Sequence, residues 1–468
     1  MKKTLYTAYY NILKWLIRFF LQSFYRRYEI VDYRKYVSGN TPIIFTPNHQ
    51  NALIDALNLV CSTFDMIKVT FLTRSDVFGK KITDKIFYSW QMLPVYRQRD
   101  GVDSLQKNEQ VFEVCRTRLM DHQGIMIFPE GNHNRLQRVR ALKKGVARIA
   151  FQTAEEKDFD PNFDLQIVPV GQNYRDHLKF HADMMVKFGE PIHLRDYYEA
   201  YRENPRRTLT TLTRDIRKAM TKLVIHIEDA ETYDLVNGAR LIYDEELIRK
   251  EDFVGGPVYQ RWQAGKKIVA ALENHLSQGS EDVADWQQKV HQYQEDIRDL
   301  RIRNHVVMNG PASVIKQLFQ AIFLLIGLPF HVLGVVPSYP IYKFAEVTAK
   351  KNFKDDHFYS SIMFVIGFLL YVPWWLILAG IIWAISGNLG YGIASFVAMP
   401  MLGKFAMLYS NQVKRWMGHW RFRSALNRKD EKAVRAAKLR KEIVDWVEGI
   451  MLPAQRGAIN PQAQQQTT

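Results

Sequence analysis

The spacing of apolar residues divides the chain into stretches of different character. Over residues 1–28, apolar and aromatic side chains recur at helical spacing, interrupted by Lys14, Arg18, Arg26 and Arg27. So many charges disfavour a membrane span, and the pattern predicts an amphipathic helix in a membrane interface. The same pattern would also suit a helix docked on the protein's own core, so both interpretations stand.

Short apolar runs alternate with helical patterns over residues 29–195. We expect strands at Ile43–Thr46, Val69–Leu72, Ile125–Phe128, Ile167–Val170 and Met185–Phe188. Strands that alternate with helices in this way predict an α/β domain, with a sheet flanked by helices. Residues 196–306 are charged and mostly helical, which predicts a helical insert whose charges face solvent.

Apolar residues then gather between residues 313 and 410, which we interpret as a membrane region. Its first stretch, Leu318–Val336, contains Pro329 and is followed by Pro337 and Pro340. Because proline interrupts a helix, this stretch favours a re-entrant or interfacial segment over a clean span.

Two further apolar stretches cover residues 358–385 and 389–409, and both reach the length of about 20 residues that a bilayer requires. Only the short turn Ser386–Asn388 separates them. They predict a C-terminal transmembrane helical hairpin. A buried pair of soluble helices is the alternative, which the crowding of apolar residues disfavours.

The charged segments around the hairpin predict its orientation. A basic helical segment is expected over residues 411–452, before a low-complexity, disordered tail over residues 453–468. Lys343–His357 carries four Lys as well, whereas Ser386–Gly390 carries no charge. By the positive-inside rule, both basic segments are cytoplasmic and the turn is outside. The α/β domain then lies on the cytoplasmic side, provided that Leu318–Val336 does not cross.

The overall charge indicates the class of partner. The chain has 64 Lys and Arg against 48 Asp and Glu, a formal net charge of +16, which suits anionic lipid, a phosphorylated substrate or nucleic acid. Aromatic residues cluster beside the apolar runs, as at a membrane interface, and no nucleic-acid-binding motif of the usual kinds occurs. We therefore expect a phospholipid bilayer, and no nucleic acid, as a partner. Cys61 and Cys115 have neither metal-type nor redox-type spacing.

Candidate chemistry begins directly after the first expected strand. His49 follows the strand end, and five residues separate it from Asp55. A His beside a carboxylate is a general-base arrangement, although a lone His near an Asp is more often structural. Since Pro47 disfavours helical geometry just before it, we expect His49 to precede a helix that begins near Gln50 or Asn51. A His49 nitrogen should then lie about 2.6–3.2 Å from an Asp55 oxygen.

Three other segments add to this pair. Phe128–Gly131 follows another expected strand and suggests a tight turn at the carboxyl edge of a sheet, where ligands usually bind. Downstream basic residues could hold a phosphate, although alone they would indicate a charged surface helix. His133 has no acidic residue beside it, so we interpret it as a turn residue. Arg97 could aim at the same pocket, and Val168–Val170 could line an apolar groove.

In this order, the four segments resemble the blocks of the glycerolipid acyltransferase family, which includes glycerol-3-phosphate and lysophosphatidic acid acyltransferases. That family has a His-x4-Asp block, an Arg-bearing block, a Phe-Pro-Glu-Gly block and an apolar-Pro block. The resemblance covers roughly residues 40–195. The spacing here is His-x5-Asp, similar to that of fungal enzymes acting on glycerol-3-phosphate and dihydroxyacetone phosphate. The third block lacks its usual Ser or Thr.

The resemblance implies a mechanism and a set of site residues. His49 would be the general base that deprotonates the acceptor hydroxyl, Asp55 would orient it, and Glu130 with Gly131 would shape the acceptor site. The alkoxide would attack the thioester of acyl-CoA or acyl-carrier protein, with no metal and no further cofactor. The residues expected to contact the acceptor phosphate are Arg97, Arg135 and Lys143.

The expected function is O-acyl transfer to 1-acyl-glycerol-3-phosphate or glycerol-3-phosphate in phospholipid biosynthesis. An acyltransferase for another acceptor, such as an amino lipid, is one alternative. A non-catalytic lipid-binding membrane protein is another, which the presence of both His49 and Asp55 disfavours. A transporter is disfavoured because only two clean spans are expected and neither carries a central charge.

Overall fold

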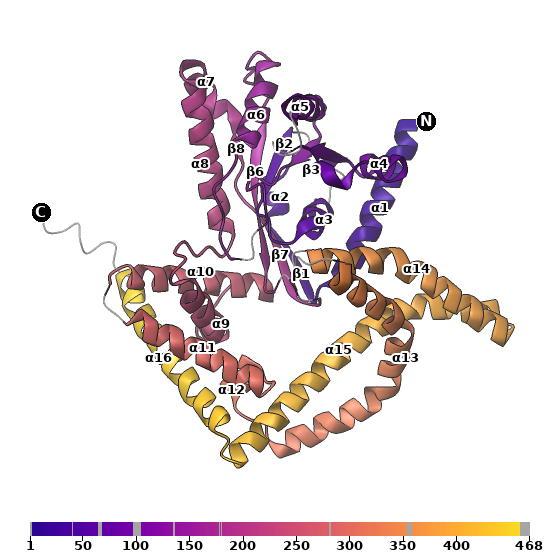
Figure 1. Ribbon diagram of the computed structural model, residues 1–468, viewed down its shortest axis with the longest axis vertical. Helices are drawn as coiled ribbons and strands as arrows, with labels where there is room; N and C mark the ends of the chain where they lie inside the picture. Colours follow the sequence, from indigo (N-terminus) through magenta and orange to yellow (C-terminus); the bar gives the residue numbers. More distant parts are fainter. Residues whose placement is uncertain are drawn as a thin grey trace, which may run out of the picture. The chain divides into compact units, whose positions relative to one another are not determined.

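The chain forms two compact units. The computed structural model describes residues 2–39, 41–63, 68–96, 104–133, 136–176, 178, 180–279, 282–352 and 358–458. Unit 1 comprises Met1–His226 and Ala349–Phe364, and unit 2 comprises Ile227–Thr348 and Val365–Thr468. Figure 1 labels the elements of both.

Unit 1 is built on a mixed, mostly parallel sheet (Figure 1). The strands are β1 (Arg27–Val31), β2 (Ile43–Pro47), β3 (Val69–Arg74), β4 (Met92–Val95), β5 (Gly124–Met126), β6 (Gln166–Tyr174), β7 (Asp183–Phe188) and β8 (Ile192–His193). They follow the order β1-β7-β6-β2-β5-β3-β4, with β8 paired to β6. Among the described strands, only the pairs β6–β7 and β6–β8 are antiparallel. The predicted α/β sheet is confirmed.

Four of the five strands expected from the sequence are buried throughout. Every residue of β2, β5, β6 and β7 is buried, and such strands are rich in apolar residues. Strands β1 and β8 are only partly buried, and β4 has four residues, so none of the three formed a clear apolar run in the sequence. The expected strand at Ile125–Phe128 ends earlier, at Met126.

Helices flank this sheet. They are α1 (Lys2–Phe24), α2 (Tyr33–Tyr36), α3 (Ala52–Ser62), α4 (Lys81–Ser89), α5 (Ser104–Met120), α6 (Gly145–Glu155), α7 (Tyr198–Glu203) and α8 (Pro205–Leu223), with 3-10 turns at Ser75–Val77 and Leu194–Tyr197. On α8, Leu212, Ile216 and Met220 recur every four residues and form one buried face. They join Ile44 and Ile167 of the sheet in one core cluster.

This packing corrects the expected domain boundary at residue 195. Helix α8 lies against β6, and unit 1 continues to His226 before unit 2 begins. The charged helical insert expected over residues 196–306 is therefore divided between the two units. The sequence misled because α8 exposes many charges on the face opposite its narrow apolar stripe.

Helix α1 uses two apolar faces. Tyr10, Ile17 and Leu21 are buried, at 4%, 8% and 0% exposure, where α1 packs on α3. Ile12 and Trp15 remain 66% exposed each. The docked interpretation is therefore correct for one face, and the other keeps the exposed aromatic and apolar side chains typical of an interfacial helix. The helix ends at Phe24, and the rest of the expected segment 1–28 enters β1.

Unit 2 contains a helical bundle made from two parts of the sequence. Its helices are α9 (Tyr233–Lys250), α10 (Pro257–Leu276), α11 (Val283–Asp299), α12 (Asn304–Asn309) and α16 (Glu431–Ala458). Helix α16 packs against α9, α10 and α11, so the basic segment 411–452 is not a separate module. Asp296 is 1% exposed and pairs with Arg435 of α16 at 2.6 Å, so some of the charges are buried. Helix α16 also continues past Pro453, and residues 459–468 of the expected tail lie outside the described residues.

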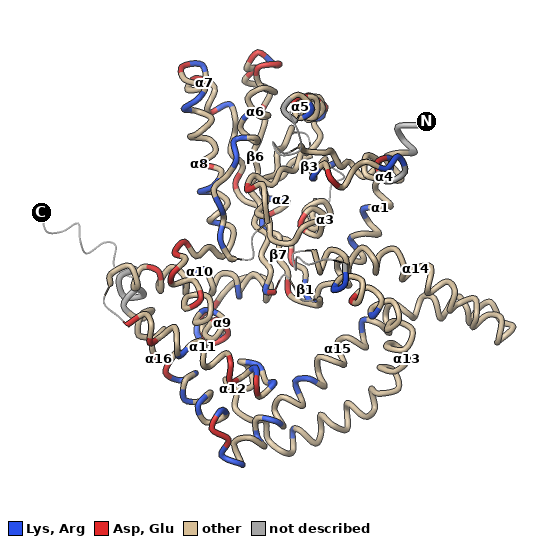
Figure 2. The backbone as a smooth tube through the Cα atoms, viewed as in Figure 1, with Lys and Arg blue, Asp and Glu red and all other residues tan. Residues whose placement is uncertain are grey.

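Among the described residues, three helices are long and apolar enough to cross a membrane. They are α13 (Val314–Asn352), α14 (Tyr359–Ser386) and α15 (Leu389–Asn427). Figure 2 shows few charged residues along α13 and α14. Helices α14 and α15 are joined at Gly387 and Asn388, as the hairpin prediction required.

The prolines of α13 do not end the helix, which corrects the expected break. Pro329, Pro337 and Pro340 all lie inside one continuous helix. Trp374 of α14 donates its indole N–H to the carbonyl of Pro337 at 2.7 Å, so a neighbouring helix supplies polar contacts to this backbone. A Cβ added at Gly334 would lie 2.2 Å from the carbonyl oxygen of Leu402, which shows how closely α13 and α15 pack.

Candidate functional site

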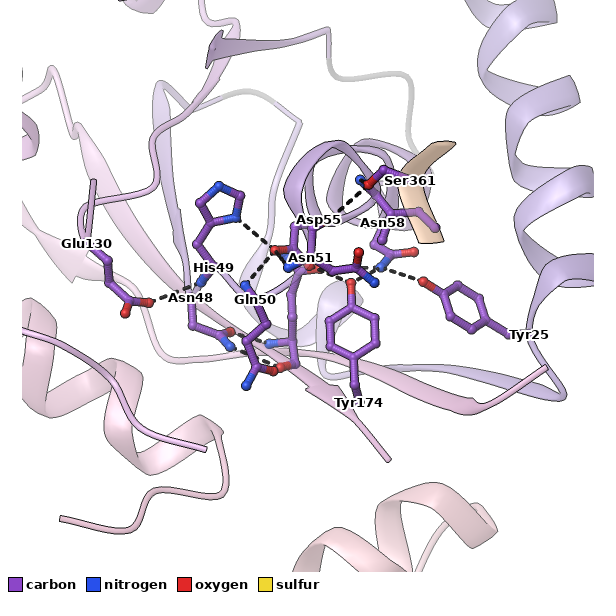
Figure 3. A network of polar contacts seen from close by, with 12 residues as sticks. Tyr25, Asn48, His49, Gln50, Asn51, Asp55, Asn58, Glu130, Tyr174 and Ser361 are labelled. Carbon is purple, nitrogen blue, oxygen red and sulfur yellow. Dashed lines mark hydrogen bonds and ion pairs between the residues drawn. The ribbon is translucent and has the colours of Figure 1, made fainter. Parts of the chain in front are cut away.

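The predicted His–Asp pair forms at the junction of β2 and α3. Strand β2 ends at Pro47 and α3 begins at Ala52, so His49 lies in the loop between them. The His49 Nδ1 lies 2.8 Å from Asp55 Oδ2 (Figure 3). The geometric prediction is therefore confirmed, with the helix starting one residue later than expected. The longer spacing is absorbed in the loop, so that Asp55 reaches the ring from the first turn of α3.

Asp55 is fully buried, and its carboxylate is held by hydrogen bonds on both oxygens. Oδ2 accepts the backbone N–H groups of Gln50 and Asn51, each at 2.7 Å, in addition to His49. Oδ1 accepts the hydroxyl of Tyr174 (Figure 3). Burial, and next the Asp55 charge, raise the pKa of Tyr174 well above its ordinary value, so this hydroxyl stays a donor. An ionised carboxylate can be buried only with such partners.

The tautomer of His49 follows from this arrangement. A carboxylate only accepts hydrogen bonds, so the neutral ring carries its proton on Nδ1 and leaves Nε2 as the basic nitrogen. Phe128 stacks on the His49 ring at 4.0 Å between centroids, and His133 meets it edge-on at 5.3 Å. The His49 side chain is 16% exposed. Nε2 can therefore receive a proton from a bound molecule while the ring stays fixed.

Glu130 connects two backbone segments of the site. Its Oε1 accepts the N–H of His49 and its Oε2 accepts the N–H of Arg140, both at 3.1 Å. The carboxyl group is 5% exposed, and burial raises its pKa while the two N–H groups oppose that rise. Because both oxygens are occupied, Glu130 shapes the site through the backbone of His49.

The turn after β5 brings a lysine beside the same segment. Gly131 has φ +73°, a conformation in which glycine is unstrained, and its N–H closes the turn to the carbonyl of Phe128. The N–H of Lys143 donates to the carbonyl of Pro129 at 2.7 Å, and its exposed side chain lies along Gly131. Of the three expected phosphate-binding residues, Lys143 is thus next to the turn, and Arg97 and Arg135 lie outside the described residues.

The fourth expected segment has a supporting position. Val168 and Val170 are fully buried in β6, where they pair with Phe45 and Pro47 of β2. They pack inside the sheet rather than on an open groove. Just beyond them, the Asn48 side chain makes two hydrogen bonds to the backbone of Gln172, which fix the loop before His49.

Behind Asp55 lies a chain of polar residues that the sequence did not reveal. Asn58 donates to Tyr174 at 2.8 Å and to Tyr25 at 3.1 Å (Figure 3). On the other side of α3, Ser361 contacts the backbone of Asn51. A polar Asn58 and a Tyr at the end of a buried strand were visible signals, but nothing in the sequence connects them with Asp55.

Metal-binding groups and reactive thiols are two further features that bear on the chemistry of this site. Among the described residues, no group of three or more His, Cys, Asp or Glu side chains could hold a metal ion. Both cysteines are buried, and burial raises the pKa of each thiol to about 12. They therefore stay protonated and are poor nucleophiles.

Comparison with known proteins gives a consistent result. Residues 28–172 match the family model described as Acyltransferase. Two yeast proteins, the glycerol-3-phosphate O-acyltransferases 2 and 1 of Saccharomyces cerevisiae, are 21% and 25% identical over 61% and 54% of this chain. The matches cover 37% and 32% of those proteins, so the chain spans only about a third of their length.

A solved structure also matches, with limited likeness. It is the 1-acyl-sn-glycerophosphate (LPA) acyltransferase PlsC from Thermotoga maritima, at 13% identity and a TM-score of 0.33. The match covers 47% of this chain and 83% of that chain. So low a score supports no argument about this site.

Replacing Glu130 by Gln should alter how stability depends on pH. A carboxyl group with a raised pKa binds its proton more tightly in the folded state, so its contribution to stability is complete below its ordinary value of 4.5 and is lost as pH rises through the folded pKa. The melting temperature of the parent protein, minus that of Glu130→Gln, should therefore decrease as the pH rises from 4.5. Melting in detergent across this range measures it.

The exposed Glu113 provides the matched control, and the pH dependence found for Glu130→Gln should exceed that found for Glu113→Gln. A difference for Glu130→Gln that grows with pH would show that Glu130 is stabilised in its ionised form, contrary to this account.

Proposed function

We propose that this protein, whose residues 28–172 belong to the acyltransferase family, is a membrane-bound O-acyltransferase that acylates a hydroxyl of glycerol-3-phosphate or of its 1-acyl derivative. The observation that carries the proposal is the 2.8 Å contact between His49 and a buried, fully hydrogen-bonded Asp55. It supports a general base of defined tautomer at the carboxyl end of a parallel strand.

The proposed reaction has one chemical step. Nε2 of His49 removes the proton from the acceptor hydroxyl as its oxygen attacks the thioester carbonyl of acyl-CoA or acyl-carrier protein. The new ester C–O bond forms, the C–S bond breaks, and the thiol leaves with the proton that His49 returns. Asp55 stabilises the transient imidazolium. No covalent acyl-enzyme is involved, in line with the burial of Cys61 and Cys115.

The acceptor is proposed to be glycerol-3-phosphate, with 1-acyl-glycerol-3-phosphate as the second candidate. Both yeast relatives bear the name of the first activity, and the His-x5-Asp spacing is similar to that of fungal enzymes. The positive charge of Lys143 beside Gly131 suits the acceptor phosphate, and Arg97 and Arg135 are proposed to join it.

The first test is an acceptor panel. Purified protein in detergent, given labelled acyl-CoA with glycerol-3-phosphate, dihydroxyacetone phosphate or 1-acyl-glycerol-3-phosphate, should form labelled ester with glycerol-3-phosphate most rapidly. Asp55→Asn should keep the fold and lower kcat by about 10²- to 10⁴-fold, because the His49 tautomer is lost. The exposed Asp121 gives the control, Asp121→Asn, which should behave as the parent. Near-normal turnover in Asp55→Asn would exclude this mechanism.

The second test concerns the phosphate. Arg97→Ala and Lys143→Ala should each lower kcat/KM for the acceptor by the equivalent of roughly 1.5–3 kcal/mol, the cost of losing a charge-assisted contact. The KM for the thioester should barely change. Arg206→Ala, at an exposed position on α8, is the charge-matched control. Variants that weaken thioester binding and spare the acceptor would contradict the assignment.

The membrane region is proposed to be anchored through α14 and α15, with α13 and the exposed face of α1 lying in the interface. Among the described residues before Val314, no helix is a candidate span. Residues 349–364, which begin in the last turn of α13, belong to unit 1. We propose that α13, although long enough to span, enters and leaves the bilayer on one face. The basic segments support a cytoplasmic unit 1.

Cysteine labelling tests this topology in cells, in a Cys61→Ala/Cys115→Ala background. A Cys at Asn388 should react with an impermeant reagent in intact cells, because the hairpin turn is outside. A Cys at the exposed Gln278, before α13, should react only after permeabilisation. If α13 crossed, these two positions would lie on the same side and label together.

A further inference from the structure

Helix α3 begins without a cap from its own sequence. Its N-cap residue Asn51 makes no side-chain capping hydrogen bond, and Ala52 has φ +38°, a strained conformation for a residue with a Cβ. The first N–H groups of a helix have no partner within the helix. The N–H of Ile54 donates to the carbonyl of Asn51 at 3.1 Å, so the N-terminus of α3, which carries Asp55, is held by this local contact and by groups from elsewhere in unit 1.

Ser361 supplies a cap from a distant part of the chain. Its hydroxyl oxygen accepts the N–H of Ile54 and donates to the carbonyl of Asn51, both at 3.2 Å (Figure 3). The side chain is buried, at 4% exposure. Ser361 lies in the first turn of α14, and 307 positions separate it from Ile54. A serine hydroxyl at the start of a helix is an effective capping group, whichever segment provides it.

The same short backbone segment also holds the His–Asp pair. The N–H of Asn51 donates to Asp55, while its carbonyl accepts from Ser361, so one residue connects the two side chains. Phe358, immediately before α14, meets the His133 ring edge-on at 5.4 Å, and His133 in turn meets His49. The start of α14 thus approaches the site from two directions.

We propose that Ser361 is a positioning residue, which fixes the N-terminus of α3 so that Asp55 keeps its contact with His49. Helix α14 is also a candidate membrane span, so activity then depends on the position of its first turn. The expected effect of Ser361 on kcat rests on the proposed function. The expected effect on the N-terminus of α3 does not. Removal of the Ser361 hydroxyl takes one of two acceptors from the Ile54 N–H and one donor from the Asn51 carbonyl, whatever the reaction.

The test compares Ser361→Ala with Ser62→Ala in the full-length protein. Ser62 is fully buried at the other end of α3, and its hydroxyl also makes two hydrogen bonds, to Asn58 and Tyr28. It therefore controls for the loss of a buried hydroxyl from the same region. Hydrogen exchange of peptides covering residues 49–59 and acyl-transfer kinetics are measured for both variants.

Ser361→Ala should speed exchange at residues 52–55 and lower kcat by roughly 3- to 30-fold, the range for losing a helix cap, with KM changed less than about 2-fold. Ser62→Ala should change neither. In an Asp55→Asn background, Ser361→Ala should have no further effect on kcat, because both act through the same pair. If Ser361 had only a general structural role, Ser361→Ala and Asp55→Asn would lower kcat by independent factors.

Unchanged exchange at residues 52–55 together with unchanged kcat would overturn the proposal, and so would an equal effect of Ser62→Ala. If the parent protein acylates no acceptor in the panel, the proposed function fails. The exchange measurement then still decides whether Ser361 caps α3.

Discussion

The buried carboxylate of Asp55 is the constraint around which the site is arranged. A charge in the interior is tolerated only when hydrogen bonds replace the water that it has lost, and this one receives two backbone N–H groups, a tyrosine hydroxyl and a histidine. These donors stabilise the charge, and they also restrict the backbone and side chains that supply them. The loop before α3 must fold back to present its N–H groups, Tyr174 must end β6 beneath it, and His49 must turn Nδ1 inward.

The sheet explains why these pieces meet. Strands β2 and β6 are neighbours in parallel register, so Pro47 and Val170 lie side by side, and β6 continues to Tyr174 beyond the end of β2. Asn48 then joins its loop to the backbone of Gln172. Glu130 adds a third segment through the N–H groups of His49 and Arg140. Each connection is made to backbone, and none of them uses Nε2 of His49.

Sequence could predict the local part of this arrangement and not the distant part. His49, Asp55 and Glu130 stand in short motifs beside apolar runs, and the buried strands are clear because most of their residues are apolar. Tyr174 lies 119 positions from Asp55, and Ser361 lies 310 from Asn51, so no periodicity could relate them. The expected domain boundary at residue 195 was wrong because α8 has more charged residues than buried apolar ones, so the sequence did not reveal that α8 packs on the sheet. The roles of Arg97 and Arg135 stay predictions from the sequence.

The order of the chain has a consequence for how the protein is made. Unit 1 is interrupted, because its last piece, Ala349–Phe364, follows after most of the helical bundle and the whole apolar part of α13. A ribosome therefore releases the His–Asp loop long before it releases the serine that completes the helix behind it. A nascent chain up to residue 226 contains every strand of the sheet but lacks one partner of the Ile54 N–H group. On the proposed role of Ser361, the contact behind Asp55 is complete only once the first turn of α14 has been synthesised.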